Sequence, residues 1–379
     1  MADAAVVSFS FPTTIVFGAG CASQLWDRFT ARVAGGATMN RPLLVTDRGL
    51  LETPAFETVR SALGGRERTF ADVQANPADA NVRAAADAFR MGGCDGVIAL
   101  GGGSAIDVAK IIRLVVAKSD KPLTSFTPDD AVGKLAPFCA IPTTAGTGSE
   151  VGRSSVVTIG GTKRVIFHPA LLADLVVLDP TLTVDLPATL TAATGADALT
   201  HCIESFTSPD FHPLCDGIAL EGIRLIKQAL LLAVKQPRDL EARGLMQIAA
   251  TMGGIAFQKD LGAAHSLAHP LSAMCGVHHG TANALVLPAV MEFNAERKPG
   301  LYSRVAVALG CANQSDACAI ATVKYLLNEI GLTGGLRGAG VKDDQLDALA
   351  AAAFQDSCHR TNPIPVTRDD LRALYQQSM

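Results

Sequence analysis

Short strand-like runs alternate with helical stretches through the first half of this 379-residue chain. The runs lie at residues 8–11, 14–17, 41–47, 67–70, 95–100, 135–141 and 175–179. Stretches with helical patterns lie between them, at residues 22–33, 53–63, 78–91 and 105–117. Strands that alternate with helices of about 10–15 residues are typical of a parallel, doubly wound sheet. The pattern therefore predicts an α/β fold for the N-terminal half.

The pattern changes near Leu186 and Pro187, where long stretches rich in alanine and leucine take over. We expect helices in this half at residues 218–233, 239–253, 282–294, 315–329 and 343–355. Just before the change, residues 155–158 and 163–167 flank a Gly-Gly pair and predict a hairpin. The sequence thus predicts two domains, an α/β domain over residues 1–187 and an all-α domain over residues 188–379.

The composition excludes several classes of partner. Hydrophobic residues make up 49% of the chain and charged residues 18%, which is enough apolar surface for a large core. The net charge of −4 gives no reason to expect a nucleic acid or an anionic membrane surface as partner. No apolar run approaches the roughly 18–20 residues of a membrane span, and the N-terminus is unlike a signal peptide. Nine scattered cysteines without a Cys-x-x-Cys pair suit free thiols, so we expect a cytoplasmic protein that acts on a small molecule.

A glycine-rich turn, Gly101–Ser104, follows the apolar run 95–100 and precedes a helical stretch. Backbone N–H groups at such a helix N-terminus bind phosphate, and glycines let the phosphate approach closely. Asp107, in the first turn of that helix, either favours the helix dipole or accepts a hydrogen bond from a ribose hydroxyl. The turn lacks a Gly-x-Gly-x-x-Gly fingerprint, so a tight strand-to-helix turn without a ligand is an equally good interpretation.

Two further segments favour a nucleotide. Asp47 ends an apolar run at the edge where open α/β sheets bind ligands, and a carboxylate there accepts hydrogen bonds from the adenosine-ribose 2′-hydroxyl. Because it would repel a 2′-phosphate, Asp47 predicts NAD rather than NADP, unless it is only a loop acid or a helix cap. The segment Pro142–Glu150 contains three threonines and two glycines, which suit close contact with phosphate or sugar.

Histidines and one aspartate are concentrated in two segments of the helical half. Asp197 and His201 are four residues apart, as are His265 and His269, so each pair lies on one helix face. One carboxylate with three imidazoles suits a divalent ion such as Fe(II) or Zn(II), with a position open for substrate. A single histidine in such a segment would more often be a buried core residue, but a cluster of this size predicts a metal site.

The candidates outnumber the ligands that such a site needs. His279 lies ten residues beyond His269, at a glycine and next to His278. Adjacent residues on a regular element point in different directions, so only one histidine of this pair is expected to bind. His269 precedes Pro270, which restricts its backbone.

The sequence resembles the iron-containing (group III) alcohol dehydrogenases over almost its whole length. Four ordered motifs carry the resemblance: Gly101–Asp107, Pro142–Glu150, Gly195–His201 and His265–Gly280. The resemblance implies an NAD(P)-binding α/β domain and a helical domain in a dehydroquinate synthase-like arrangement, with the active site in the cleft between them. It also implies NAD and Fe(II), or Zn(II), as cofactors, and a homodimer or larger oligomer.

The resemblance assigns roles to individual positions. His269 matches the non-ligand histidine that contacts the nicotinamide or relays a proton, and Asp47 matches the position that disfavours NADP. The metal-ligand positions of the family match Asp197, His201, His265 and His279. The other cofactor-contacting positions match Asn76, Gly102, Gly103, Ser104, Thr143, Thr144, Thr147 and Lys163.

The implied reaction is metal-dependent hydride transfer between a primary alcohol, or its aldehyde, and NAD. Maleylacetate reductases of the same family work without metal, but all four ligand positions are present here. Arg153, beside Ser154 where the family usually has asparagine, and Lys259, in an unusually short segment, suit a substrate carboxylate unless they are solvated. A hydroxy-acid or semialdehyde dehydrogenase is therefore an alternative. A metal- or nucleotide-binding sensor on the same fold is the non-catalytic alternative.

Overall fold

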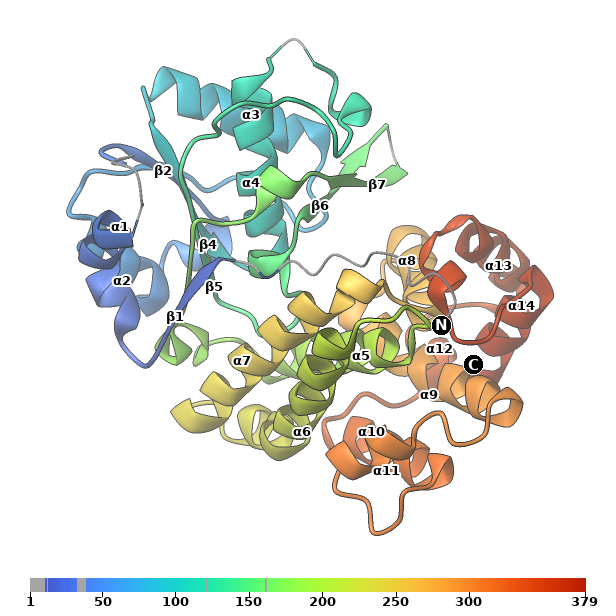
Figure 1. Ribbon diagram of the computed structural model, residues 1–379. Coiled ribbons are helices and arrows are strands. Elements are labelled where there is room, and N and C mark those ends of the chain that lie inside the picture. Colours follow the sequence, from blue (N-terminus) through green and yellow to red (C-terminus); the bar gives the residue numbers. More distant parts are fainter. Residues whose placement is uncertain (1–10, 12, 33–38, 120, 161) are drawn as a thin grey trace, which may run out of the picture. The chain divides into compact units, whose positions relative to one another are not determined.

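The computed structural model describes residues 11, 13–32, 39–119, 121–160 and 162–379. The chain divides into two compact units, which Figure 1 shows in the colours of the sequence. One unit contains Pro12–Leu186 together with Pro237–Gln247, and the other contains Pro187–Gln236 and Ile248–Met379. The first unit is an α/β structure and the second is helical, so the predicted fold class is confirmed.

A six-stranded sheet forms the centre of the α/β unit. Its strand order is β1-β8-β5-β4-β2-β3, and all of these neighbours are parallel. The four central strands are buried along their whole length, because helices cover both faces of a parallel sheet. The strand bounds are β1 Thr14–Phe17, β2 Pro42–Val45, β3 Arg68–Phe70, β4 Gly96–Gly101, β5 Phe138–Pro142 and β8 Leu175–Leu178.

Four helices connect these strands (Figure 1). α1 (Leu25–Arg32) packs against α2 (Pro54–Leu63), and α3 (Asp79–Met91) packs against α4 (Gly103–Ala117). Right-handed crossovers through this strand order put α1 and α2 on one face and α3 and α4 on the other. The carboxyl ends of β2, β4 and β5 therefore meet at one edge of the sheet. The 3₁₀ helices of this unit are Cys21–Gln24, Arg48–Leu50, Leu123–Ser125, Ser149–Val151, Pro169–Leu171 and Pro180–Thr183.

An antiparallel hairpin of β6 (Ser154–Ile159) and β7 (Thr162–Phe167) packs on α4, and a buried polar network fixes it there. The Lys110 Nζ donates to the Ser149 hydroxyl at 3.0 Å and to the Ser154 carbonyl at 2.9 Å. The Ser149 hydroxyl in turn donates to Asp107 at 2.6 Å. Burial lowers the pKa of Lys110 to about 8, although the Asp107 carboxylate opposes the change. The hairpin that the sequence predicts is thus confirmed, with α4 as its support.

The segment Pro237–Gln247, which includes the first half of α7 (Leu240–Ala256), belongs to the α/β unit. The Gln247 side chain donates to the carbonyls of Pro142 at 3.3 Å and Asp179 at 3.4 Å. A side chain at Gly244 would come within 3.0 Å of the Phe17 ring. The predicted division into residues 1–187 and 188–379 does not include this segment in the α/β domain. The predicted domain bounds stay a prediction.

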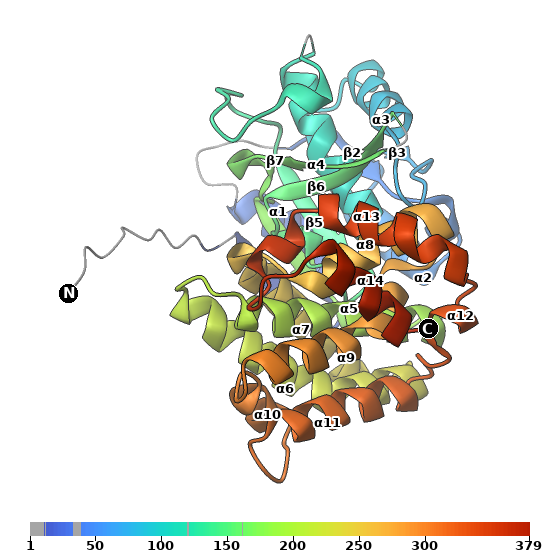
Figure 2. The same cartoon turned by 90° about the vertical axis from the view of Figure 1, so that its right-hand side faces the viewer.

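The helical unit is built around α5 (Ala188–Thr207), whose residues are nearly all buried. α5 packs against α6 and α9, and α9 packs against α8. Figure 2 shows α13 and α14 lying beside α8, where both make contacts. The other helices are α6 Pro213–Lys235, α8 Ala263–Cys275, α9 His279–Arg297, α10 Ser303–Ala308, α11 Asp316–Glu329, α12 Gly335–Gly338, α13 Leu346–Gln355 and α14 Arg368–Gln377. The 3₁₀ helices of this unit are Phe257–Lys259, Asp343–Gln345 and Cys358–Thr361.

The start of α9 lies very close to α5. A Cβ atom built on Gly280 would lie 2.0 Å from the carbonyl oxygen of Ala193 and 3.3 Å from the Cβ of Asp197. A glycine is therefore required next to His279, because any side chain would push α9 away from the helix that carries Asp197.

Differences from the predicted elements are small and have local causes. The helix expected at 218–233 begins at Pro213, because His212 caps it by accepting the Cys215 N–H at 3.2 Å. The helix expected at 22–33 begins as a 3₁₀ turn before α1. Of the strand expected at 8–11, residues 8–10 lie outside the described residues. Within the described part of the chain, no helix has the length and apolarity needed to cross a bilayer.

The approach of α9 to α5 predicts a large effect for Gly280→Ala. The added methyl meets backbone rather than a flexible side chain, so we expect a loss of about 3 kcal/mol in stability, the upper end for overpacking. Gly217→Ala on the exposed side of α6 meets nothing within 4 Å and should instead stabilise by about 0.5–1 kcal/mol. Urea unfolding of both variants measures the contrast, and equal effects would contradict the close contact.

Candidate functional site

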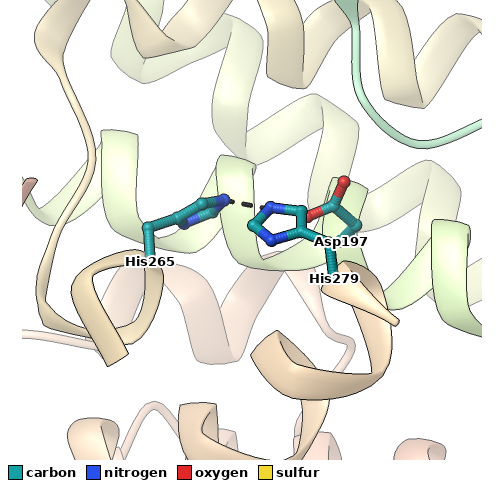
Figure 3. A group of neighbouring side chains, drawn as sticks. All are labelled: Asp197, His265 and His279. Carbon is teal, nitrogen blue, oxygen red and sulfur yellow. Dashed lines mark ion pairs between the residues drawn. The ribbon is translucent and has the colours of Figure 1, made fainter. Parts of the chain in front are cut away.

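Three candidate ligands from three helices converge in the helical unit (Figure 3). Asp197 comes from α5, His265 from α8 and His279 from the first turn of α9. One side-chain atom of each lies within 4.8 Å of the other two. The Asp197 Oδ1 lies 3.7 Å from the His265 Nε2 and 3.4 Å from the His279 Nε2. Helix packing thus brings together three of the four residues that the sequence predicts as ligands.

The fourth predicted ligand, His201, lies one turn after Asp197 on α5. Its Nε2 is 4.0 Å from the Asp197 Oδ1, and its ring stacks on that of His265 with the centroids 4.7 Å apart. Ligand atoms around a tetrahedral ion, with bonds of about 2.0–2.2 Å, lie about 3.3–3.6 Å apart. Separations of 3.4, 3.7 and 4.0 Å from Asp197 are close to that range. A divalent ion therefore fits these residues after small side-chain movements.

The charges of these groups also suit a cation. Burial would raise the pKa of Asp197, but the surrounding histidines hold it below its usual range. Burial lowers the pKa of His279 well below its ordinary value, so this imidazole is neutral at pH 7. Burial would lower the pKa of His265 as well, but Asp197 and Glu204 outweigh it and raise that pKa to about 9. An ion that binds here takes the place of the His265 proton.

Glu204 is a site residue that the sequence motifs do not contain. The His265 Nδ1 donates to the Glu204 carboxylate at 2.6 Å, and the Ala264 N–H donates to it at 2.7 Å. A carboxylate at the outer ring nitrogen fixes the ring and leaves the Nε2 for a metal. Glu204 lies seven residues after Asp197, on the same face of α5, and this spacing is the signal that would have indicated it.

His269, the predicted proton relay, has a carboxylate partner of its own. Its ring stacks on that of His279 with the centroids 5.3 Å apart, and its Nδ1 donates to Asp356 at 2.7 Å. Asp356 also accepts the Ser266 hydroxyl at 2.9 Å and the Cys358 N–H at 2.8 Å. Burial raises the pKa of Asp356, but the hydrogen bond from His269 holds it below its usual range. The Nε2 of His269 is therefore the nitrogen left to accept a proton.

Three further polar residues, Cys358, Asn362 and His278, lie outside the group formed by Asp197, His265 and His279. Cys358 lies with His269 and Asp356, and burial raises its thiol pKa well above the ordinary value. The Asn362 amide is buried and exchanges hydrogen bonds with Asn294. His278 is exposed and lies outside the group that contains its neighbour His279.

In the α/β unit, the glycine turn and the threonine loop contact each other. A Cβ atom at Gly103 would lie 2.9 Å from the Thr147 methyl, and one at Gly102 would lie 3.3 Å from the Thr144 methyl. The Thr143 N–H donates to the Gly101 carbonyl at 3.0 Å. The two segments thus adjoin at the N-terminus of α4, which begins at Gly103 and continues with Ser104. Phosphate binding at such a terminus is expected on general grounds.

Asp47 lies beside this turn. Its Oδ1 accepts the Gly49 N–H at 2.9 Å and so caps a 3₁₀ helix. Its Oδ2 lies 3.7 Å from the Cβ position of Gly101. The two interpretations that the sequence leaves open, a cap and a nucleotide contact, are therefore compatible, because each uses a different oxygen.

The remaining predicted cofactor residues differ in what surrounds them. Asp107 lies beyond the first turn of α4, not within it as predicted, because the helix begins at Gly103. Both of its oxygens accept hydrogen bonds from the protein, one from Ser149 and one from the Val156 N–H at 2.9 Å, which favours a structural role over a ribose contact. Asn76 is exposed and has a φ of 55°, which asparagine tolerates better than most residues. The side chain of Lys163 lies outside what the structure describes.

Family models match both halves of the chain. A model described as iron-containing alcohol dehydrogenase matches residues 12–180, and the C-terminal model of the Fe-containing alcohol dehydrogenase family matches residues 191–379. The chain belongs to the iron-containing alcohol dehydrogenase family. Its members are oxidoreductases, and the resemblance noted in the sequence is thereby confirmed.

Individual members of the family resemble the chain over nearly its whole length. A 4-hydroxybutyrate dehydrogenase of Cupriavidus necator is 40% identical over 90% of this chain and 93% of its own. An NAD-dependent methanol dehydrogenase of Bacillus methanolicus is 32% identical over 99% of this chain and 100% of its own. The crystal structure of a 1,3-propanediol oxidoreductase superposes with a TM-score of 0.92 at 32% identity, covering 98% of this chain and 100% of the other.

The position of Asp47 beside the glycine turn predicts the coenzyme preference of this family member. Asp47→Ser keeps a capping oxygen but removes the charge, so we expect kcat/KM with NADP⁺ to rise at least tenfold relative to NAD⁺. Asp72→Asn is the control, since Asp72 is an exposed neighbouring acid that pairs with Arg48 at 2.6 Å. Equal use of NADP⁺ and NAD⁺ by the unaltered enzyme, or the same change in both variants, would refute the assignment.

Proposed function

We propose that this protein is a metal-dependent oxidoreductase that transfers a hydride between a primary alcohol, or its aldehyde, and NAD. The observation that supports the proposal most is the convergence of Asp197, His265 and His279, with His201 adjacent, in a chain that also has a glycine turn at a helix N-terminus. In this proposal residues 1–187 bind NAD and residues 188–379 bind the metal, which is Fe(II) or Zn(II). The expected oligomer, a homodimer or larger, stays a prediction.

The proposed chemistry divides between cofactors and side chains. An ion held by Asp197, His201, His265 and His279 would supply a Lewis acid that polarises the substrate oxygen, and NAD would carry the hydride. Glu204 keeps the His265 Nε2 turned towards the ligand group by holding the Nδ1 at 2.6 Å. His269, whose Nδ1–H is held by Asp356, offers its Nε2 to the proton that the alcohol loses. The products of oxidation are an aldehyde, NADH and that proton.

Metal removal separates the two histidine roles. Activity should vanish on chelation and return with Fe(II) or Zn(II). His265→Ala should lose the metal because the ring carries a predicted ligand, whereas His269→Ala should keep the metal and lose about 10²–10⁴-fold in kcat, as expected for a general acid or base. Metal analysis with steady-state kinetics measures both. Full activity of a verified metal-free preparation would refute the metal dependence, and loss of metal from His269→Ala would refute the ligand assignment.

A hydroxy-acid substrate is the second candidate, and the similarity to a 4-hydroxybutyrate dehydrogenase favours it. Of the two cations that the sequence offers as a carboxylate anchor, Lys259 is buried and pairs with Asp216 at 2.5 Å. Its charge is thus neutralised within the protein. Arg153 immediately precedes the hairpin that packs on α4, and its guanidinium lies 5.4 Å over the ring of Phe167, the last residue of that hairpin. We propose Arg153 as the anchor if the substrate is an acid.

Comparison of 4-hydroxybutyrate with 1-butanol tests this second candidate. If Arg153 binds the carboxylate, Arg153→Gln should lower kcat/KM at least tenfold for the acid and leave 1-butanol within about twofold, since a lost charge-assisted hydrogen bond costs about 1.5–3 kcal/mol. Lys259→Met is the matched control and should not discriminate between the two substrates. If kcat/KM of the wild-type enzyme is about a hundredfold or more higher for 1-butanol than for 4-hydroxybutyrate, the hypothesis of an acid substrate is wrong.

A further inference from the structure

We propose that Asn283 is a positioning residue that orders the metal ligands, an inference that rests on the metal site of the proposed function. Asn283 lies on α9, four residues after His279, and its side chain is completely buried. The spacing puts its amide on the same helix face as the imidazole of His279, one turn further along. It belongs to none of the motifs by which the sequence predicts the site.

The amide nitrogen of Asn283 contacts all three ligand atoms that converge. The Nδ2 lies 2.8 Å from the Asp197 Oδ1, 3.1 Å from the His265 Nε2 and 3.3 Å from the His279 Nε2. These are the atoms of the candidate metal site, in which the two Nε2 atoms lie 3.7 and 3.4 Å from the Asp197 Oδ1. An amide nitrogen has two hydrogens to donate, and the shortest contact, with Asp197, is the best placed to receive one.

The opposite end of the amide supports this orientation. The Asn283 Oδ1 is buried and has no hydrogen-bond partner among the described residues. An unpaired buried carbonyl costs about 1–3 kcal/mol. Exchanging the amide oxygen and nitrogen would place the oxygen 2.8 Å from the Asp197 carboxylate oxygen, where two acceptors repel each other. The Asp197 carboxylate therefore fixes the amide nitrogen towards the ligand group.

Two opposite effects on metal affinity follow from these contacts. An N–H group near an imidazole nitrogen competes with an ion for the lone pair, which weakens binding. Against this, the 2.8 Å hydrogen bond holds the Asp197 carboxylate in place before an ion arrives, and the Oδ1 that accepts it lies 3.4 and 3.7 Å from the Nε2 atoms of His279 and His265. The contacts that compete with an ion are the two longer ones, with the histidine Nε2 atoms. The carboxylate oxygen of Asp197, in contrast, can accept the 2.8 Å hydrogen bond and bind an ion at the same time. We therefore infer that the ordering effect is the larger.

The variant Asn283→Leu tests the inference, because leucine has nearly the same shape and no N–H. We expect Co(II) and Zn(II) to bind about 10–100-fold more weakly, the usual effect of removing an outer partner of a ligand. Metal is added to metal-free protein in the presence of a chromogenic chelator, and the competition between the two gives the dissociation constants of the metal complexes. The visible absorption of the Co(II) form should also change, since it reports the geometry around the ion, which a general loss of stability would not alter.

Asn294→Leu is the matched control. Asn294 is a buried asparagine of the same helix whose amide bonds to Asn362 and Tyr302 rather than to the three ligand atoms. The Asn294→Leu variant should be less stable than the unaltered protein, and its metal affinity should stay within about twofold of the unaltered value. If Asn283→Leu does not fold, Asn283→Ala removes the same donor without added bulk and carries the same expectation. Circular dichroism and unchanged NAD binding establish that a variant is folded.

The outcomes distinguish the inference from the function on which it rests. Unchanged or tighter metal binding in a folded Asn283 variant would overturn the positioning role and identify the amide as a bystander or a competitor. A loss of affinity as large in Asn294→Leu would overturn it as well, because the effect would then be general. If the unaltered protein binds neither Co(II) nor Zn(II), the proposed metal site itself fails, whatever the variants do.

Discussion

The packing of the helical unit depends on the contacts of one buried carboxylate, that of Asp197. Its side chain is almost completely excluded from solvent on α5. A buried charge without partners costs far more than a fold of ordinary stability can offset. Its partners come from two other helices, α8 with His265 and α9 with His279, so α9 must pack closely on α5 and α8 must pack on α9. The contact at Gly280 is the visible consequence, because only glycine allows α9 to approach so near.

One face of α5 carries most of the chemistry. Asp197, His201 and Glu204 follow one another at intervals of four and three residues in a helix whose other buried positions are mainly small and apolar. The two acids bracket the ring of His265, with Glu204 2.6 Å from its Nδ1 and Asp197 3.7 Å from its Nε2. An imidazole between two carboxylates retains its proton to higher pH, which is why its pKa is raised. The same arrangement attracts a metal ion once the proton leaves.

The sequence predicts those parts of the site whose spacing is local. The pairs four residues apart place Asp197 with His201 and His265 with His269, and the structure keeps each pair on one helix. Partners from distant segments leave no such periodicity with the residues that they contact. Asp356 holds His269 from 87 residues away, and Asn283, although it lies four residues after His279, contacts Asp197 from 86 residues away. These positions are set by how α9 and the C-terminal segment pack, which composition and spacing do not encode.

The buried charged residues of the two units differ in whether a protein group of opposite charge neutralises them. Lys259 is neutralised by Asp216, and Lys110 lies in a network with Asp107, so both buried cations are satisfied within the protein. The acids around His265 are different. Among the ion pairs of the described residues, those of Asp197 and Glu204 involve histidines alone. Two buried carboxylates balanced only by imidazoles, at least one of them neutral, leave a deficit of positive charge that a divalent cation would meet.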